Sequence, residues 1–480
     1  MTDTTQNRWA ALYVLCAGML MIILDGTIVN VALPSIQEDL GFSQSSLAWV
    51  VNAYLIALGG LLLLAGRVGD LLGRRRIYLA GLALFTAASL LCGVSGSQEM
   101  LIAARFVQGV GGAMASAVVL GMIVTMFPEP REQAKAIGIY AFVASAGASI
   151  GLLAGGVLTQ AINWHWIFFV NVPIGFVAAA LAVRLVADDR GIGLGRGADL
   201  AGAVLVTGAL MLGVYTIVEV PGHGWGSTHT LGFGAVSLAL LAAFVARQAT
   251  AADPLLPLRI FRSRNVAGAN AIQFLMVAGM FGMFFIGVLL MQRVLGYDAI
   301  ETGLAFLPVS VGIGVLSLFF APRLTLRFGE RAVLIPALAL LVAGLAWLTR
   351  VPADASYWVD LMPSMVLLGV GAGLTFPALS TLAMSGATQS DAGLASGLLN
   401  TTVQVGGAVG LAVLATLSTE HTAGRLAEGE GATSALTSGY QLAFTISAVL
   451  LVVAIALAAA VLERPRRQEA VVAEPAYDMR

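Results

Sequence analysis

Long apolar runs, separated by short polar connections, occupy most of the chain. A helix needs roughly 20 apolar residues to cross the hydrocarbon core of a bilayer, and about fourteen runs here reach spanning length. The runs are continuous and do not alternate between apolar and polar positions, which disfavours a β-barrel. The pattern therefore predicts an all-α integral membrane protein. The expected spans are residues 9–33, 49–65, 77–95, 101–127, 134–158, 166–186, 200–218, 231–245, 266–291, 303–320, 332–348, 361–384, 394–417 and 440–462.

Composition supports the same class of protein. Hydrophobic residues make up 59% of the chain and charged residues only 11%, with a mean hydropathy of +0.91. A soluble chain of this length requires a charged surface that so few charges cannot supply. The net charge of −1 argues against a nucleic-acid partner. Cys16 and Cys92 fall in separate apolar spans, so we expect them to be packing residues without a disulfide.

The sequence gives no support to an enzyme or an ATP-driven pump. Its short connections leave no room for a soluble catalytic domain. Lys135, the only lysine, follows an alanine, so the chain lacks the phosphate-binding motif G-x-x-x-x-G-K. His165, His223, His229 and His421 fall in connections without the spacing of metal ligands. We expect no enzymatic activity and no metal.

Basic residues fall almost entirely in alternate connections. Of the 25 lysines and arginines, only Arg293, Arg350 and Arg425 lie in the opposite set of connections, and Arg105 lies inside a span. Positively charged connections remain on the cytoplasmic side of a membrane. We therefore expect an even number of spans with both termini in the cytoplasm. The arginine-rich, nearly lysine-free composition indicates a GC-rich bacterial genome, and hence the bacterial cytoplasmic membrane as the location.

The two ends of the chain resemble each other. Residues 65–75 have a degenerate counterpart in residues 321–331, and residues 108–112 have one in residues 368–372. Parallel halves of six helices are typical of secondary transporters, whose site lies between the halves near the midplane. The expected domains are an N-terminal six-helix bundle (1–190), an inserted helix pair (191–262), a C-terminal six-helix bundle (263–465) and a cytoplasmic tail (466–480).

Four motifs resemble those of a known family, the major facilitator superfamily. Residues 24–34, LDGTIVNVALP, resemble the first-helix motif of its fourteen-helix drug:proton antiporter subfamily. Residues 66–76 match the superfamily loop motif G-x-x-x-D-x-x-G-R-R/K, and residues 105–109 match its fourth-helix motif R-x-x-Q-G. Residues 164–175 resemble the start of helix six in the subfamily. The resemblance covers nearly the whole chain.

The resemblance implies a major facilitator fold with two linker helices. It also implies proton-coupled export of small lipophilic or cationic organic compounds, such as antibiotics, by alternating access. The partners would be the small-molecule substrate, protons and the lipid bilayer. The proton gradient would supply the energy without a cofactor, and we expect a monomer.

Two departures from the subfamily pattern affect this interpretation. Leu152 stands where the fifth-helix antiporter motif usually has a proline, and His165 replaces a basic residue between two tryptophans. The first departure leaves an importer or facilitator of the same fold as an alternative. A non-transporting membrane receptor or a lipid-handling scaffold is a second alternative, which a flux measurement in vesicles would exclude.

Asp25 is the strongest candidate for function because a carboxylate inside a membrane span is energetically costly, by about 3 kcal/mol on insertion scales. It lies about 24 Å along the first helix, counted from the inner end. Arg105 lies about 8 Å from the outer end of the fourth helix, so both charges are expected in the outer third of the membrane. Burial favours a protonated carboxyl and a facing guanidinium favours the carboxylate, so the pair, facing across a cavity, suits proton coupling. The alternative is a permanent ion pair that only joins two helices.

The loop motif contributes Gly66, Asp70, Gly73, Arg74 and Arg75. We expect the Asp70 carboxylate to meet a helix N-terminus or an arginine of the other half and so to favour the outward-open state. The alternative is a basic loop that only sets membrane orientation.

Several further side chains are candidates for the substrate cavity. Polar groups would bind directly, although hydrogen bonds between helices explain any single one equally well. Methionine and phenylalanine side chains would form an adaptable apolar surface, or else pack against neighbouring helices. A carboxylate at the outer end of the seventh helix is a secondary coupling candidate, with a solvated interfacial position as the alternative. The cavity candidates are Asn30, Asn52, Tyr54, Gln108, Gln273, Met280, Phe284, Asn400 and Gln404, and the secondary acid is Glu219.

Overall fold

The structure is a computed structural model that describes residues 2–43, 45–189, 191, 199–252, 254–384 and 392–462. The expected tail over residues 466–480 lies outside these ranges. The described residues form helices and connections without a strand.

The first half of the chain forms one bundle, in which α3 packs on α4, α2 on α4 and α1 on α5. Apolar side chains fill its interior. Its elements are α1 (Thr2–Leu40), η1 (Ser46–Ala48), α2 (Trp49–Leu72), α3 (Arg74–Gly93), α4 (Gln98–Met126), α5 (Pro130–Ala161), α6 (Trp166–Phe169) and α7 (Asn171–Leu185).

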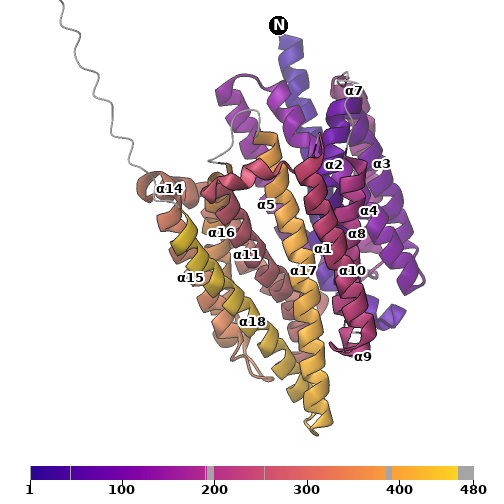
Figure 1. The fold of residues 1–480 in the computed structure, drawn as a ribbon, viewed down its shortest axis with the longest axis vertical. Coiled ribbons are helices and arrows are strands. Elements are labelled where there is room, and N and C mark those ends of the chain that lie inside the picture. The colour runs from indigo at the N-terminus through magenta and orange to yellow at the C-terminus, as the bar shows by residue number, and fades with distance from the viewer. Residues whose placement is uncertain are drawn as a thin grey trace, which may run out of the picture.

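The last part of the chain forms a second bundle, in which α15 packs on α16 and α11 packs on α17 and α18 (Figure 1). Three of its spans contain short π-helical turns. Its elements are α11 (Arg264–Leu289), η3 (Leu290–Val294), α12 (Ala299–Ala305), α13 (Leu307–Val315), η4 (Leu316–Phe320), α14 (Ala321–Phe328), α15 (Glu330–Leu348), η5 (Tyr357–Leu361), α16 (Met362–Met384), α17 (Ala392–Ala427) and α18 (Ala432–Val461).

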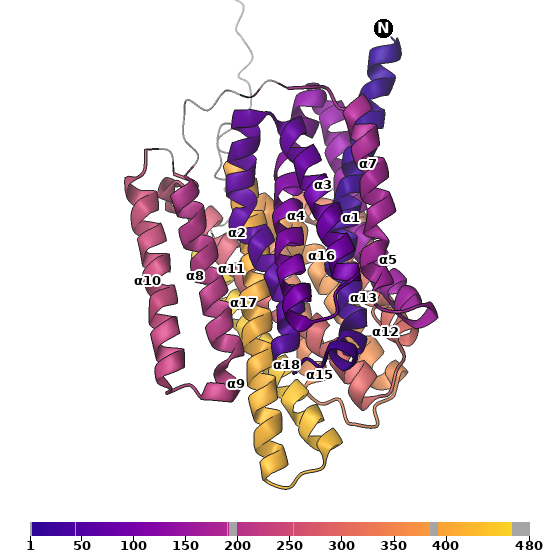
Figure 2. The ribbon, with the colours of Figure 1, turned by 90° about the vertical axis from the view of Figure 1, so that its right-hand side faces the viewer.

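A helix hairpin joins the two bundles. It consists of α8 (Leu200–Val218), the short α9 (Val220–His223) and α10 (Thr228–Thr250), and η2 (Leu258–Arg262) follows it. Helix α8 packs against α2 of the first bundle and α17 of the second. Helix α10 packs against α8 and stands on the outside of the molecule (Figure 2).

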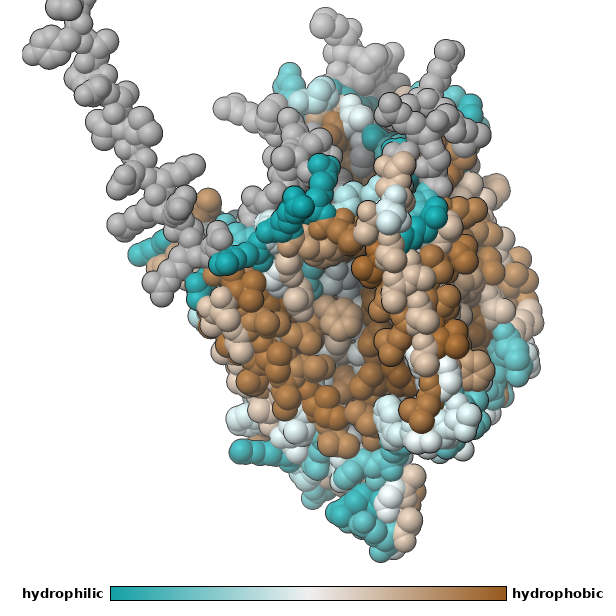
Figure 3. Space-filling model, in the orientation of Figure 1, coloured by the Kyte–Doolittle hydropathy of each residue, from teal (hydrophilic) through white to brown (hydrophobic). Residues whose placement is uncertain are grey.

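The membrane-spanning pattern is confirmed. Among the described residues, 13 helical segments are long and apolar enough to cross a bilayer, and each matches one predicted span. The remaining predicted span, residues 134–158, lies within α5, which is 32 residues long. Figure 3 shows the hydrophobic band that results on one face of the molecule, with hydrophilic residues at both ends. The chain is therefore an all-α, multi-pass membrane protein.

The internal repeat has a counterpart in the backbone. Gly73 separates α2 from α3 at φ 104°, and Gly329 separates α14 from α15 at φ 84°. Both conformations disfavour any residue with a side chain. The two glycines occupy equivalent positions in the related segments 65–75 and 321–331. We call the end of the bundle that carries these turns, and the start of α1, the terminal face, and the opposite end the distal face (Figure 2).

Asp199 fastens the inserted hairpin at the terminal face. Its carboxylate caps α8 by accepting a hydrogen bond from the Gly202 backbone N–H at 2.9 Å, and it pairs with Arg247 of α10. Gln248 Nε2 donates a further bond at 2.8 Å. Burial acts to raise the pKa of Asp199, but these bonds outweigh burial and hold the pKa below its ordinary value. The carboxylate therefore stabilises the folded hairpin.

We expect Asp199→Ala to lower the free energy of unfolding by about 1–2 kcal/mol at neutral pH, because a cap and an ion pair are lost together. Since the folded pKa is depressed, the stabilisation is present above the ordinary value of 3.8 and fades as the pH falls further. Thermal unfolding in detergent at several pH values measures both effects. Asp354→Ala, at an exposed position of the distal face, is the control. Equal stability of the two variants at neutral pH would contradict the stabilising role of Asp199.

Candidate functional site: a buried ion pair between helices

Asp25 and Arg105 form an ion pair in the interior of the first bundle. The Arg105 Nη1 lies 2.5 Å from the Asp25 Oδ2, and both side chains are 0% exposed. The sequence predicted similar depths for the two charges, facing each other across a cavity. The structure instead brings the two side chains into direct contact, because α1 and α4 pack in the same bundle.

Amide side chains complete the surroundings of the carboxylate. Asp25 Oδ1 accepts hydrogen bonds from Gln108 Nε2 at 2.8 Å and from Asn171 Nδ2 at 2.7 Å. Gln108 Nε2 also donates to Ser89 Oγ at 2.8 Å. Gln108 and Asn171 are, like the ion pair, 0% exposed. Three donors from two helices other than α1 thus converge on one buried carboxylate and take the place of its lost hydration.

Arg105 is held on its remaining sides by α2 and by Gln108. Its Nε donates to the Val50 carbonyl at 2.8 Å, and its Nη1 donates to Gln108 Oε1 at 2.7 Å. Its guanidinium carbon lies 4.3 Å from the centroid of the Tyr54 ring, in cation–π geometry. The Tyr54 hydroxyl donates to the Ile22 carbonyl of α1 at 3.1 Å. Of the predicted cavity residues, Tyr54 and Gln108 therefore belong to this ion-pair network.

Two members of the network, Asn171 and Ser89, were not among the residues predicted from the sequence. Asn171 is the first residue of α7 and lies within the segment 164–175, which was assigned to a motif without a role for this side chain. A polar amide at the start of an apolar span was the available signal. Ser89 gave no signal, since an isolated serine in a span also bonds its own helix, as its hydroxyl does to the Phe85 carbonyl.

The loop motif lies at the terminal face and contacts its own bundle. Asp70 Oδ1 accepts bonds from Arg74 Nε at 3.0 Å and Nη2 at 2.9 Å, and Arg74 Nη1 donates to the Gly121 carbonyl of α4 at 3.0 Å. The expected contact of Asp70 with the other half is thus replaced here by an ion pair within the loop. Gly66 lies close to α4, where its nearest neighbour is Ala117.

A different carboxylate occupies the helix N-terminus beside this loop. Asp189 accepts hydrogen bonds from the backbone N–H groups of Arg74 at 2.8 Å and Arg75 at 3.0 Å, which open α3. The Arg75 side chain pairs with Asp188 at 3.7 Å and donates to the Val183 carbonyl of α7. The end of α7 therefore anchors the loop, by residues that sequence analysis did not single out.

The other predicted cavity residues fall in several environments. Asn30 donates only to carbonyls of its own helix, those of Gly26 and Thr27. Asn52 is fully buried, and neither of its amide atoms has a hydrogen-bond partner in the described structure. Gln273 is also buried.

The apolar cavity candidates and those on α17 also lie in different environments. Met280 is buried in the second bundle, and the Phe284 ring packs against Phe306 in a tilted arrangement with ring centroids 5.3 Å apart. Asn400 is exposed and Gln404 is half-buried beside Gly59 of α2, so α17 carries both along the boundary between the bundles.

Glu219 lies at the distal end of α8, outside the ion-pair network. It caps the helix end and pairs with His223 at 3.8 Å, with 37% of its side chain exposed. This position agrees with an interfacial, solvated carboxylate. Within the described residues, no cluster of three or more histidine, cysteine, aspartate or glutamate side chains has the geometry to hold a metal ion.

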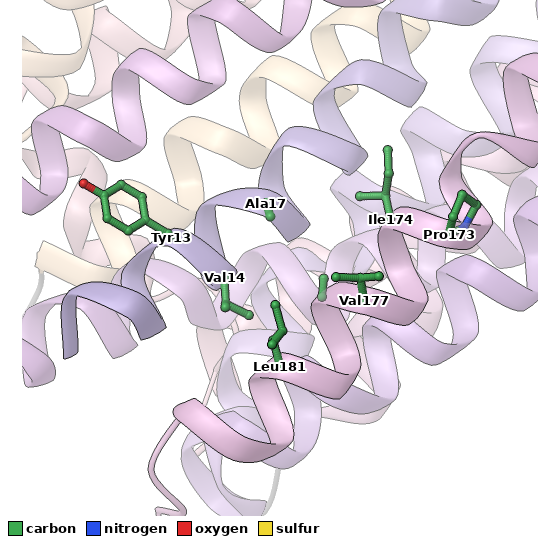
Figure 4. A pocket seen from close by; sticks show the side chains of 8 residues that line it. Tyr13, Val14, Ala17, Pro173, Ile174, Val177 and Leu181 are labelled. Carbon is green, nitrogen blue, oxygen red and sulfur yellow. The ribbon is translucent and has the colours of Figure 1, made fainter. Parts of the chain in front are cut away.

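An apolar groove of about 490 Å³ runs between α1 and α7 (Figure 4). Tyr13 and Val177 at its edge are 59% and 54% exposed, on helices that span the membrane. The groove therefore faces the lipid side of the bundle and is separate from the ion pair. Its lining is Tyr13, Val14, Ala17, Pro173, Ile174, Val177, Ala178 and Leu181.

Hydrogen bonds join the two bundles at the distal face. Arg293 Nη2 donates to Gln37 Oε1 at 2.5 Å, and Gln160 Nε2 donates to Asp298 Oδ2 at 3.0 Å. Beside them, α5 and α12 approach closely: a Cβ placed on Gly156 would lie 2.5 Å from the Ala299 carbonyl oxygen. The bundles are thus closed against each other at this face.

Two helix bundles built from related halves of the chain are typical of secondary membrane transporters. The sequence matches the family model of the Major Facilitator Superfamily over residues 15–411, and the chain belongs to this family of transporters. It is therefore a multi-pass membrane transporter and not an enzyme.

Characterised relatives connect the chain with antibiotic resistance. The puromycin resistance protein pur8 of Streptomyces alboniger is 40% identical over 459 residues, 95% of this chain and 90% of that protein. The cephamycin export protein CmcT of Amycolatopsis lactamdurans is 39% identical over 429 residues, which cover 89% and 88% of the two chains. Among solved structures, the nucleoside transporter NupG shares the fold with a TM-score of 0.65 at 12% identity, covering 93% of this chain and 99% of that one.

We expect Gly156→Val to open the distal face, because its side chain would collide with backbone of the other bundle. Positions 163 and 354 are exposed in distal connections of different bundles and can carry spin labels. Double electron–electron resonance measures the distance between the two labels. The labels require a background without Cys16 and Cys92. The mean distance should increase in Gly156→Val and stay unchanged in Gly232→Val, where a Cβ meets no atom within 4 Å. An unchanged distance in Gly156→Val would refute the role of this contact.

Proposed function

We propose that the chain exports small lipophilic or cationic organic compounds, antibiotics among them, in exchange for protons. The observation that carries the proposal is the fully buried Asp25–Arg105 pair inside membrane-spanning helices. The names of the two relatives, a puromycin resistance protein and a cephamycin export protein, support the substrate class.

Asp25 is the proton carrier in this proposal. A buried ion pair is a poor source of stability, because desolvation of both charges offsets much of their attraction. A carboxylate at that position is better explained by a change of charge during transport. Protonation removes the charge that attracts Arg105 and so weakens the link between α1 and α4. The proton movement also supplies energy, about 2.3 kcal/mol for each charge that crosses 100 mV.

The conformation of the described bundles represents one step of this cycle. With both termini in the cytoplasm, the distal face is the extracellular one, and the bundles are closed there by the bonds of Arg293 and Gln160. This is the state in which an exporter loads its substrate from the cytoplasm or from the inner leaflet. The transporter acts as a monomer, with the bilayer as its surroundings.

We expect Asp25→Asn to lower ΔpH-driven flux in proteoliposomes by at least about tenfold, since an amide cannot carry the proton and a buried arginine is left unpaired. Puromycin and ethidium are the probes, with a protonophore as the reference for uncoupled flux. Exchange of labelled for unlabelled probe without a gradient should persist, because it requires alternating access but no net proton movement.

Asp25→Asn combined with Arg105→Gln is the matched variant, because it removes both buried charges and restores electrical balance. It should bind the probes and remain uncoupled. Full ΔpH-driven flux by Asp25→Asn would refute the role of Asp25 as proton carrier. Probe accumulation in the direction of the proton flux would establish an importer, and absence of any flux in the folded wild-type protein would support a non-transporting function.

A further inference from the structure

The donors around Asp25 present a problem for a carboxyl group that must be protonated. Arg105 Nη1 faces Oδ2, and Gln108 Nε2 and Asn171 Nδ2 face Oδ1. All three are N–H donors. Both acceptor sites of Oδ1 are taken by donors, so a proton added to that oxygen has no acceptor until one of the neighbouring groups rearranges.

Two of the three groups are unable to rearrange. A guanidinium has no acceptor atom, so Arg105 always donates. The Gln108 amide is fixed at both ends: Oε1 accepts from Arg105 Nη1 at 2.7 Å, and Nε2 donates to Ser89 Oγ as well as to Asp25. If the Gln108 amide turned over, its Nε2 donor would face the Arg105 Nη1 donor, and Ser89 Oγ would lose the hydrogen bond that it accepts from Gln108.

Asn171 differs from both. Its Nδ2 donates to Asp25 at 2.7 Å, whereas its Oδ1 is buried and has no hydrogen-bond partner in the described structure. An unpaired buried amide oxygen is costly. This oxygen becomes an acceptor for Asp25 if the side-chain amide turns by half a rotation. The other titratable groups near Asp25 are Tyr54 of α2, which donates to the Ile22 carbonyl, and Cys92 of α3, which donates to Gln108 at 3.6 Å.

We propose that Asn171 is a positioning residue that adapts to the protonation state of Asp25 by turning over its side-chain amide. A hydronium ion gives its proton to Asp25 Oδ1 and departs as water, Asn171 Nδ2 moves away, and Asn171 Oδ1 accepts the new O–H hydrogen bond. The contact between α1 and the start of α7 therefore persists in both states, while the attraction of Arg105 is lost. This inference rests on the proposed role of Asp25 as proton carrier.

Infrared difference spectroscopy on the full chain in lipid vesicles tests the proposal, with asparagine side-chain carbonyls labelled with ¹³C. The acid-minus-neutral spectrum should gain a carboxyl C=O band that is absent in Asp25→Asn. It should also show a labelled amide band moving to lower frequency, as expected for an amide oxygen that gains a donor. The amide change should vanish in both Asp25→Asn and Asn171→Leu.

The variants separate this proposal from the proposed function. In Asn171→Leu, the carboxyl band should persist at higher frequency, because the O–H has lost its acceptor. ΔpH-driven flux should fall about tenfold, the effect of one hydrogen bond to a charged group, with probe affinity unchanged. Asn171→Ser, whose hydroxyl both donates and accepts, should recover part of the flux. In Gln108→Leu, the labelled amide band should still respond to pH.

A carboxyl band that titrates without any amide change in the wild type would overturn the role of Asn171 and leave the proton carrier intact. Absence of a titrating Asp25 band would overturn both ideas. Equal ΔpH-driven flux in Asn171→Leu and the wild type would also refute the role of Asn171 as a positioning residue.

Discussion

The ion pair between Asp25 and Arg105 constrains the architecture of the whole first bundle. Neither charge has access to solvent, so protein groups must replace the lost hydration. Helix α4 supplies Arg105 and Gln108, α7 supplies Asn171, and α2 supplies a carbonyl and the face of an aromatic ring. Four of the spanning helices are therefore fixed around one point by the need to satisfy a single pair of charges.

The second bundle has no equivalent among its described residues, where every buried polar side chain is uncharged. Its buried amides and hydroxyls include Asn270, Gln273, Thr302 and Ser364. The two halves resemble each other in sequence and in the glycine turns at the terminal face, but they differ in buried charge. In the proposed function, a proton that changes the first bundle would alter its contacts with a second bundle whose described interior stays uncharged. The two links named above between the bundles, Arg293 to Gln37 and Gln160 to Asp298, each have one charged partner and contribute about 1.5–3 kcal/mol net.

Sequence patterns predicted most of the fold because bilayer thickness and charge deficit leave few alternatives. They also singled out Asp25 and Arg105, since a charge in an apolar span is conspicuous. Asn171, Asp188 and Asp189 were not singled out. Their importance comes from long-range contacts: α7 returns to α1 and to the start of α3, which no local pattern reveals. The sequence left open whether these two charges face each other across a cavity or pair directly, because depth along a helix does not specify which face meets which neighbour.

The position of the inserted hairpin restricts how the bundles can move. Helix α8 contacts both α2 and α17, so rigid-body rocking must slide the hairpin along one of them. Hydrogen bonds tie it to α17, from Thr416 Oγ1 to the Ile217 carbonyl at 3.0 Å and from Trp225 Nε1 to Glu420 Oε2 at 2.9 Å. Its approach to α2 is made by Thr207 over Gly60, a contact without a hydrogen bond on the threonine hydroxyl. Sliding past a glycine breaks fewer hydrogen bonds than leaving α17. In the proposed transport cycle the hairpin is therefore expected to travel with the second bundle and to leave the bundle that carries Asp25 and Arg105 free to move.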